Sequence, residues 1–151
     1  MPSVLHLIER RIISWNERLD SLLEASLDDR FLTIDLQSLL NHSSGFAAHR
    51  DYWKRLKSIE AGDKKKWLLD QLVNENFEYE TGSTHLYSDV GYILLGYVVE
   101  IKSGLSLDHY WRKHIAEPAG VEEQLVFPSQ LEKRNMMSWV STGNCRWSMR
   151  P

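Results

Sequence analysis

The chain has 151 residues, of which 42% are hydrophobic and 26% are charged. This length and composition suit one globular domain and argue against a largely disordered chain. The formal net charge is −3, from 18 basic and 21 acidic residues, so there is no electrostatic case for binding nucleic acid or an anionic membrane. The single cysteine, Cys145, excludes an intrachain disulfide.

No segment of the sequence is typical of a membrane span or a secretion signal. The longest uncharged apolar stretch, residues 90–99, is far shorter than the roughly 18–20 residues that cross a bilayer. The first residues lack a basic segment before an apolar run and a small-residue cleavage site. We therefore expect no membrane association and no signal peptide in this chain, and its compartment stays unknown.

Apolar residues at three- and four-residue spacing predict helices along most of the chain. The first amphipathic stripe, from Val4 to Leu23, predicts one long helix. Thr33-Ile34-Asp35 offers a start for the next helix, which the turn residues 41–45 end. Further helices are expected over residues 47–59, 63–74 and 89–103, followed by one that Ser106 begins and that Pro118 and Gly120 end.

Extended structure is expected to be scarce. Residues 77–80 alternate apolar and polar side chains, which indicates a short extended segment at best. Residues 125–127 could form a short strand and residues 129–137 a short helix, while the tail from residue 141 shows no periodicity and is expected to fray. The sequence thus predicts a mainly helical fold with at most short strands.

The predicted helix over residues 89–103 is uncharged on both faces along most of its length. A helix that is apolar all round is a buried one, so this helix should form the core of the domain. Gly91 and Gly96 each cost about 1 kcal/mol of helix stability relative to alanine. We interpret them as marking a close approach of another backbone.

A polar cluster, Tyr87-Ser88-Asp89, stands at the start of this helix. A helix N-terminus offers unpaired N–H groups and a positive partial charge, so polar side chains held there can face a ligand. The alternative is purely structural: Ser88 or Asp89 caps the helix and Tyr87 packs its ring. The local pattern alone favours this second interpretation.

Three blocks of sequence add to that pattern. Residues 39–46 read Leu-Leu-Asn-His-Ser-Ser-Gly-Phe, residues 87–96 read Tyr-Ser-Asp-Val-Gly-Tyr-Ile-Leu-Leu-Gly after Thr81-Gly82, and residues 103–121 run from Ser-Gly to Pro-Ala-Gly-Val. In order and spacing these blocks resemble the serine β-lactamase and penicillin-binding protein superfamily, closest to its class C β-lactamase, DD-peptidase and esterase branch. The branch carries Leu-Leu-x-His-Thr-Ser-Gly-Leu, then Tyr-Ser-Asn-x-Gly-Tyr-x-Leu-Leu-Gly, then a helix ending in Pro-Leu-Gly-Met.

The resemblance implies roles for the polar cluster. In the family, a Ser-x-x-Lys motif supplies the nucleophile, the tyrosine of Tyr-x-Asn moves protons, and the third position binds the substrate amide. By this match Tyr87 would be catalytic, and Asp89 with Ser88 would bind substrate. Asp89 replaces the usual asparagine, and an ionised carboxylate accepts hydrogen bonds but does not donate them. Substrate contacts at this position would therefore differ.

Other parts of the family's catalytic apparatus are missing from the sequence. No lysine has a serine three residues before it, and neither Lys-Thr-Gly nor His-x-Gly occurs. By the match, the nucleophile motif would fall upstream of Met1. The chain therefore resembles one truncated domain, residues 1–151, equivalent to the helical subdomain of the family's α+β fold with the flanking sheet segments absent. A nucleophile, base and oxyanion hole act as a unit, so this chain alone is expected to be inactive.

Cofactor and metal signatures are likewise missing. The sequence contains no glycine-rich phosphate loop and no dinucleotide fingerprint. Its six histidines are scattered, and His109 and His114 are five residues apart, which does not place them on one helical face. We therefore expect no cofactor and no metal site.

These observations leave several interpretations open. The first is an incomplete serine β-lactamase-like hydrolase, whose full-length relative would act on a β-lactam, peptide or ester through an acyl-enzyme. The second is a non-catalytic helical interaction domain, because a helical lobe without its sheet would expose apolar faces that pair with a partner or a second copy. The third is a portion of a longer active enzyme. The sequence does not choose among β-lactamase, DD-peptidase and esterase.

Overall fold

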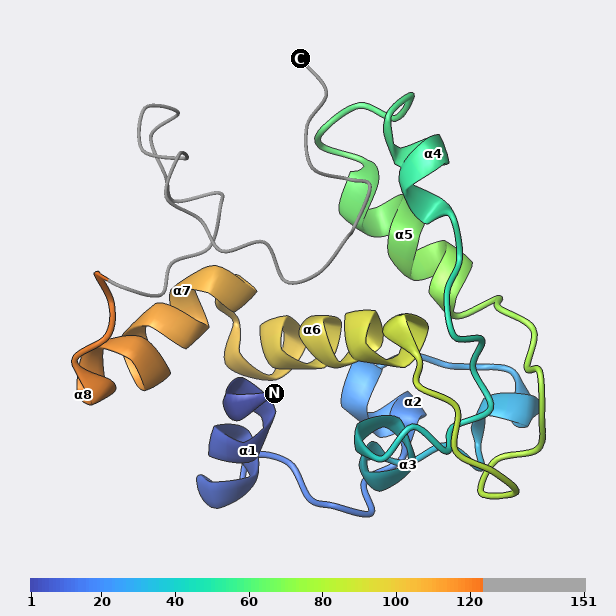
Figure 1. Cartoon of the computed structure of the whole chain (residues 1–151), viewed down its shortest axis with the longest axis horizontal. Coiled ribbons are helices and arrows are strands. Elements are labelled where there is room, and N and C mark those ends of the chain that lie inside the picture. Colours follow the sequence, from blue (N-terminus) through green and yellow to red (C-terminus); the bar gives the residue numbers. More distant parts are fainter. Residues whose placement is uncertain (124–151) are drawn as a thin grey trace.

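The computed structural model describes residues 1–123 as a mainly helical arrangement (Figure 1). Its elements are α1 (Pro2–Glu9), α2 (Leu19–Leu23), the 3₁₀ turn η1 (Asp29–Phe31), α3 (Leu36–Leu40), α4 (Tyr52–Leu56), α5 (Lys64–Leu72), α6 (Asp89–Ser103), α7 (Leu107–Trp111), the π-helical turn η2 (Arg112–Ala116) and α8 (Glu117–Ala119). Within the described residues, extended pairing is limited to the isolated bridges Arg18–Asp35 and Phe46–Phe77. The predicted mainly helical fold is confirmed. The strand, helix and tail expected after residue 124 lie outside the described residues.

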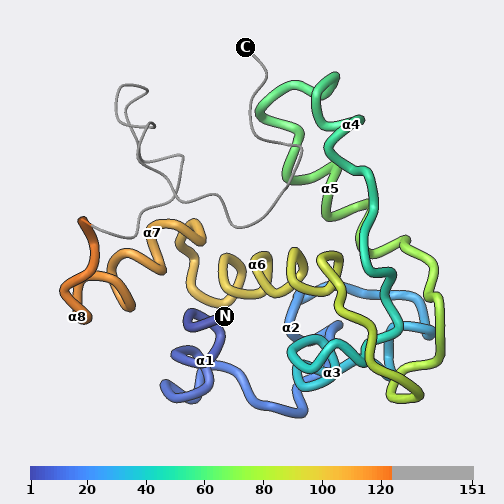
Figure 2. The backbone as a smooth tube through the Cα atoms, in the orientation of Figure 1, coloured from blue at the N-terminus to red at the C-terminus, as the bar shows by residue number. Residues whose placement is uncertain are grey.

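Helix α6 is the centre of the arrangement. Helices α2 and α3 pack against its N-terminal half and α1 against its C-terminal half, while α5 and α7 contact it from the other side (Figure 2). Its buried residues all lie on one face: Val90, Gly91, Leu94, Leu95, Val98 and Val99. The prediction of a buried helix is therefore correct for this face. The opposite face, with Ile93, Gly96 and Tyr97, lines an open groove instead.

The ends of α6 are set by local chemistry. The Ser88 hydroxyl accepts a hydrogen bond from the N–H of Gly91 at 3.1 Å, which caps the N-terminus. Gly104 ends the helix in the left-handed conformation, with φ of 69°. Both boundaries agree with the helix predicted over residues 89–103.

The interpretation of the two helix glycines is wrong. A Cβ placed at Gly91 would lie 3.5 Å from a methyl group of Leu39, and one at Gly96 would lie 3.5 Å from a methyl group of Leu107. These neighbours are side chains at ordinary contact distance, not backbone. The close backbone approach occurs at Gly45, where φ is 92° and a Cβ would lie 2.7 Å from the carbonyl oxygen of Tyr79.

The long first helix predicted over residues 4–23 is also wrong. Helix α1 ends at Glu9, and α2 begins only at Leu19. Between them, backbone groups bond to a distant segment: the N–H of Leu19 donates to the carbonyl of Ile34 at 2.9 Å. The carbonyl of Glu17 accepts a hydrogen bond from the N–H of residue 36 at 3.0 Å. These backbone groups therefore bond to residues 34–36 and not within a helix. Tertiary hydrogen bonds therefore override the helical period.

A similar competition shortens the helix predicted over residues 47–59 to α4, Tyr52–Leu56. The backbone before it bonds to other parts of the chain, because the carbonyls of Ala47 and Ala48 accept hydrogen bonds from Ser88 and Asp89. The short extended segment predicted over residues 77–80 is present as the Phe46–Phe77 bridge. Helix α5, Lys64–Leu72, falls within its predicted range.

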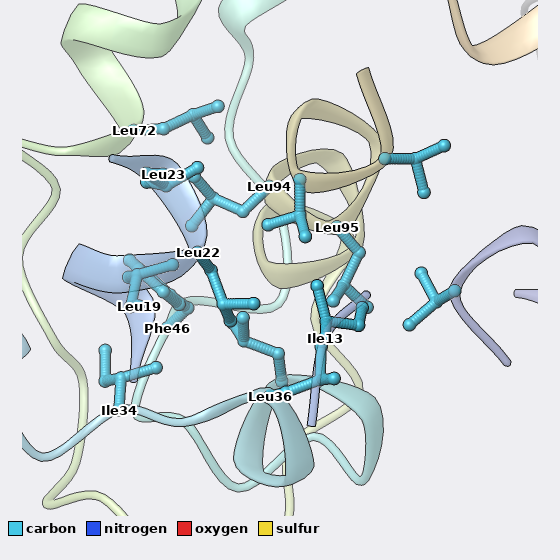
Figure 3. Close-up of a cluster of buried hydrophobic side chains, with 14 of the residues drawn as sticks. Ile13, Leu19, Leu22, Leu23, Ile34, Leu36, Phe46, Leu72, Leu94 and Leu95 are labelled. Carbon is cyan, nitrogen blue, oxygen red and sulfur yellow. The ribbon is translucent and has the colours of Figure 1, made fainter. Parts of the chain in front are cut away.

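The hydrophobic core fills the space beneath α6 (Figure 3). Leu22 and Leu23 of α2 lie beside Leu94 and Leu95 of α6, and these four side chains and that of Leu19 are at most 5% exposed. Burying each such leucine stabilises the fold by about 1.5–3 kcal/mol. This packing holds α6 rigidly and thereby fixes the position of the residues at its N-terminus.

The described part of the chain has neither a long apolar helix nor a cluster of metal-binding side chains. Among the described residues, no single helix is both long and apolar enough to cross a membrane, and only the bent pair Asp89–Ser103 and Leu107–Ala119, at 75°, meets those criteria jointly, on length and composition alone. Within the same residues, no group of three or more His, Cys, Asp or Glu side chains could hold a metal ion.

Candidate functional site

The polar cluster at the start of α6 is fastened to the loop that follows α3. The Ser88 hydroxyl donates to the carbonyl of Ala47 at 2.7 Å, and its backbone N–H donates to Nδ1 of His42 at 3.1 Å. The N–H of Asp89 donates to the carbonyl of Ala48 at 2.8 Å. These bonds join two segments about 40 residues apart, and they fix the backbone from which Tyr87 and Asp89 extend.

Side chains on either side of this anchor face solvent. Ser88 is only 1% exposed, whereas Tyr87 is 66% exposed and the Asp89 side chain is 50% exposed. An exposed large aromatic side chain next to a carboxylate, both on a fixed backbone, is an arrangement that can meet a ligand. The buried Ser88 hydroxyl makes two hydrogen bonds inside the protein. It donates to the carbonyl of Ala47 and accepts from the N–H of Gly91.

His42 is the residue that brings Tyr87 and Asp89 into one cluster. Its imidazole stacks on Tyr92, with ring centroids 4.5 Å apart and planes at 10°, and contacts Tyr87 at 4.6 Å. Its backbone lies in the left-handed region, with φ of 62°, which is uncommon for a residue other than glycine. The loop therefore holds the imidazole against both tyrosine rings.

The protonation state of His42 follows from its contacts. Nδ1 accepts the N–H of Ser88, so the neutral ring carries its proton on Nε2. Burial lowers the pKa of His42, and the negative charge of Asp89 partly opposes this effect. A neutral imidazole with an N–H thus lies beside the phenol and the carboxylate.

A second histidine, His49, completes the cluster. Its Nδ1 lies 3.1 Å from a carboxylate oxygen of Asp89, and its Nε2 lies 3.7 Å from a carboxylate oxygen of Asp51. The Asp89 carboxylate therefore has a partner that orients it. Sequence reasoning did not find His49, because 40 residues separate it from Asp89 and no local pattern links the two.

The candidate nucleophiles of the His42 loop are buried. Ser43 and Ser44 are 5% and 1% exposed, and the Ser43 hydroxyl donates to the side chain of Asn41 at 2.6 Å. The Ser44 hydroxyl has no hydrogen-bond partner among the described residues. Neither serine is presented to a substrate, which agrees with their interpretation as turn residues.

A long apolar groove begins at the cluster and follows the exposed face of α6. It has a volume of about 840 Å³ and runs from His49 and Asp89 to Leu107 and Met1. Its walls come from α4, α5 and α6, through side chains that include Trp53, Leu56, Leu68, Ile93 and Tyr97. The charged residues along it are few and of both signs, among them Lys65 and Glu100, which form an ion pair at 2.7 Å.

Comparisons with known proteins identify the family of the chain. A family model described as Beta-lactamase matches residues 3–147. The chain is 36% identical over 97 residues to a protein of Escherichia coli K12 named as a D-alanyl-D-alanine carboxypeptidase; the match covers 64% of this chain and 22% of that protein. A protein of the same name from Salmonella schwarzengrund is 33% identical over 101 residues, covering 66% of this chain and 23% of that protein. The chain thus spans less than a quarter of the length of these relatives.

Solved structures show the same fold. A penicillin-binding protein of Bacillus halodurans superposes with a TM-score of 0.63 at 24% identity, covering 87% of this chain and 42% of that one. The octameric penicillin-binding protein homologue of Pyrococcus abyssi superposes with a TM-score of 0.61 at 23% identity, covering 78% and 28%. The family match over nearly the whole sequence, together with these likenesses, shows that the chain belongs to the β-lactamase family and is equivalent to a helical segment of its fold.

Proposed function

We propose that this chain forms the Tyr87–Asp89 side of a serine hydrolase site, which takes an acyl substrate of the β-lactam, peptide or ester class. The observation that carries the proposal is the arrangement at the start of α6: Tyr87 and Asp89 are exposed on either side of the buried Ser88, and Asp89 also lines the end of an apolar groove. Family membership supplies the class of reaction.

Each residue has a distinct role in this proposal. The Tyr87 hydroxyl moves a proton between the serine nucleophile and the leaving group, a step that requires the nucleophile and lysine that the sequence lacks. The Asp89 carboxylate, oriented by His49, accepts a hydrogen bond from an N–H of the substrate. Ser88 acts on the substrate only through the backbone that it fixes, because its side chain is buried.

The experiment separates binding from turnover. The chain is incubated with a chromogenic β-lactam and with a short-chain ester, and hydrolysis is compared with that of the Tyr87→Phe variant. We expect no turnover above the buffer rate for either protein, and weak binding of the β-lactam, seen as NMR shifts of Tyr87 and Asp89. Turnover that survives in Tyr87→Phe, or shifts confined to other regions, would overturn the assignment.

A matched pair of variants tests the role of the carboxylate. Asp89→Asn restores a donor at the position, and Asp51→Asn removes a neighbouring exposed carboxylate that also lies near His49. We expect Asp89→Asn to change the affinity for the β-lactam several-fold and Asp51→Asn to leave it unaltered. Equal effects of both changes would attribute binding to general charge and would contradict the assigned role of Asp89.

The groove along α6 favours a second function, that of an interaction domain. The groove has a volume of about 840 Å³ and is lined mainly by apolar side chains, with charges of both signs along it. A surface that carries both signs can be self-complementary, as a two-fold dimer requires. The occupant that we propose is therefore a second copy of this chain.

Sedimentation at micromolar concentrations tests the dimer. Leu68→Glu places a charge in the groove, whereas Leu5→Glu places one on α1 at a side chain that is already 49% exposed and outside the groove. We expect Leu68→Glu to shift the protein toward the monomer and Leu5→Glu to leave its association unaltered. A wild-type protein that sediments as a monomer throughout would exclude this function.

A further inference from the structure

A second pocket lies at the other end of α6, where α1 meets α7 and η2. It has a volume of about 270 Å³ and is lined by His6, Arg10, Ile12, Lys102, Ser103, Leu105, Tyr110 and His114. Within the described part of the chain, no acidic side chain lines it. Because α6 has 15 residues, this pocket is about 20 Å along the helix axis from the Tyr87–Asp89 cluster.

The aromatic members of this pocket are held by one another. The Tyr110 hydroxyl and Nδ1 of His6 are hydrogen-bonded at 2.7 Å, and Tyr110 itself is 3% exposed. The rings of His6 and His114 stack with centroids 5.2 Å apart, and His114 also contacts the ring of Tyr110 at 4.7 Å. His114 lies in the π-helical turn Arg112–Ala116, an irregularity that often occurs at functional sites.

The charges around the pocket are positive and only partly neutralised. The charge of Lys102 is already balanced, because it donates to the carbonyl of Ser21 at 2.8 Å and pairs with Glu24 at 3.3 Å and with Glu17 at 3.5 Å. Arg10 makes no ion pair with any residue that the structure describes. Burial lowers the pKa of His114, and the positive charges of His6, Lys113 and Arg10 lower it further. The cluster therefore disfavours full protonation unless a negative charge enters.

We propose that this pocket binds an oxyanion, a phosphate, sulfate or carboxylate group, between the Arg10 guanidinium and the imidazoles of His6 and His114. The guanidinium supplies a planar pair of N–H donors that matches two oxygens of such a group. The imidazoles add donors and, once protonated, charge. The Tyr110 hydroxyl keeps His6 in place, and no residue of the Tyr87–Asp89 cluster takes part.

Anion binding and protonation are linked, which makes the proposal measurable. A bound anion favours the imidazolium form, so sulfate should raise the pKa of His114 by roughly one pH unit. By the same linkage, sulfate should bind more tightly as the pH falls and His114 becomes protonated. The groups that set this response are His6 and Arg10 of α1, Lys102 of α6, Tyr110 of α7, and Lys113 and His114 of η2.

The experiment follows the imidazole resonances of the full chain by NMR in a pH titration. Sodium sulfate is compared with sodium chloride at equal ionic strength, because sulfate remains a dianion throughout and chloride reports screening alone. Inorganic phosphate and acetate are further arms: preference for phosphate and sulfate indicates a phosphoryl-type ligand, and equal binding of acetate indicates a carboxylate. Either preference supports an oxyanion site.

Two variants make the result decisive. Arg10→Gln removes the guanidinium at an exposed position and should weaken sulfate binding roughly tenfold. Arg55→Gln removes an exposed arginine of α4, outside the pocket, and should leave binding unaltered. Identical His114 titrations in sulfate and chloride, or an undiminished sulfate effect in Arg10→Gln, would overturn the proposal.

Discussion

Nδ1 of His42 accepts a hydrogen bond from the backbone N–H of Ser88, at 3.1 Å, across 46 residues of sequence. The bond joins the loop after α3 to the first residue before α6, directly beside Tyr87. The imidazole that accepts it is stacked on Tyr92. The geometry of the candidate site therefore depends on a histidine that touches no substrate in the proposed function.

The first prediction concerns acid pH. Burial lowers the pKa of His42 in the folded protein below that of an ordinary imidazole, so its neutral form stabilises the fold. This contribution is complete above the unfolded pKa and is lost as the pH falls through the folded one, because protonation of Nδ1 removes the acceptor for Ser88. We expect acidification below pH 6 to cost about 1 kcal/mol through this bond. Urea unfolding of wild type at neutral and acid pH measures it.

His42→Asn is the control for that prediction, since asparagine tolerates the left-handed backbone at this position but does not titrate. The burial that lowers the pKa of His114 also contributes to the acid sensitivity of both proteins. The variant should therefore lose less stability on acidification than wild type does. Equal losses would mean that the bond between His42 and Ser88 does not carry the effect.

The second prediction concerns the cap of α6. Ser88→Ala removes the acceptor for the N–H of Gly91 and the donor to the carbonyl of Ala47, both buried. We expect a loss of about 1–2 kcal/mol in the free energy of unfolding. Ser106→Ala is the matched comparison, because Ser106 precedes α7 without a side-chain cap bond, and it should cost clearly less. Thermal and urea unfolding of both variants decide the point.

The third prediction concerns Gly45. Its φ of 92° is rarely adopted by L-residues, and a Cβ there would lie 2.7 Å from the carbonyl oxygen of Tyr79. Gly45→Ala should therefore destabilise the fold by more than about 1 kcal/mol and disturb the His42 loop. Gly62→Ala meets no atom within 4 Å and should be neutral or slightly stabilising. Similar stabilities for the two variants would contradict the strain at Gly45.

Sequence reasoning succeeded where the signal was local. The sequence predicted the start of α6 at Ser88 or Asp89 and the start of α3 within Thr33-Ile34-Asp35. The structure uses Ser88, and Asp35, which accepts the N–H of Ser38 at 2.8 Å. The burial of one face of α6 follows from its composition. These features depend on residues within one or two helical turns of each other.

Prediction failed where distant segments compete for the backbone. The N–H of Leu19 bonds to Ile34, which breaks an otherwise continuous helical pattern. His49 reaches Asp89 across 40 residues, and no periodicity could have indicated that contact. The hydrogen bond between His6 and Tyr110 spans 104 residues, and no sequence pattern indicated it either. Such contacts depend on how the helices pack against one another, and local sequence patterns carry no information about that packing.

Helix α6 connects the candidate site, the groove and the basic pocket. Its N-terminus presents Tyr87 and Asp89, its exposed side floors the groove, and its last turn borders the basic pocket. A stiff rod of this kind transmits displacement along its whole length. If a ligand at any one of these three places displaces α6, it changes the affinity at the other two, and thermodynamic reciprocity requires the same factor in the reverse direction.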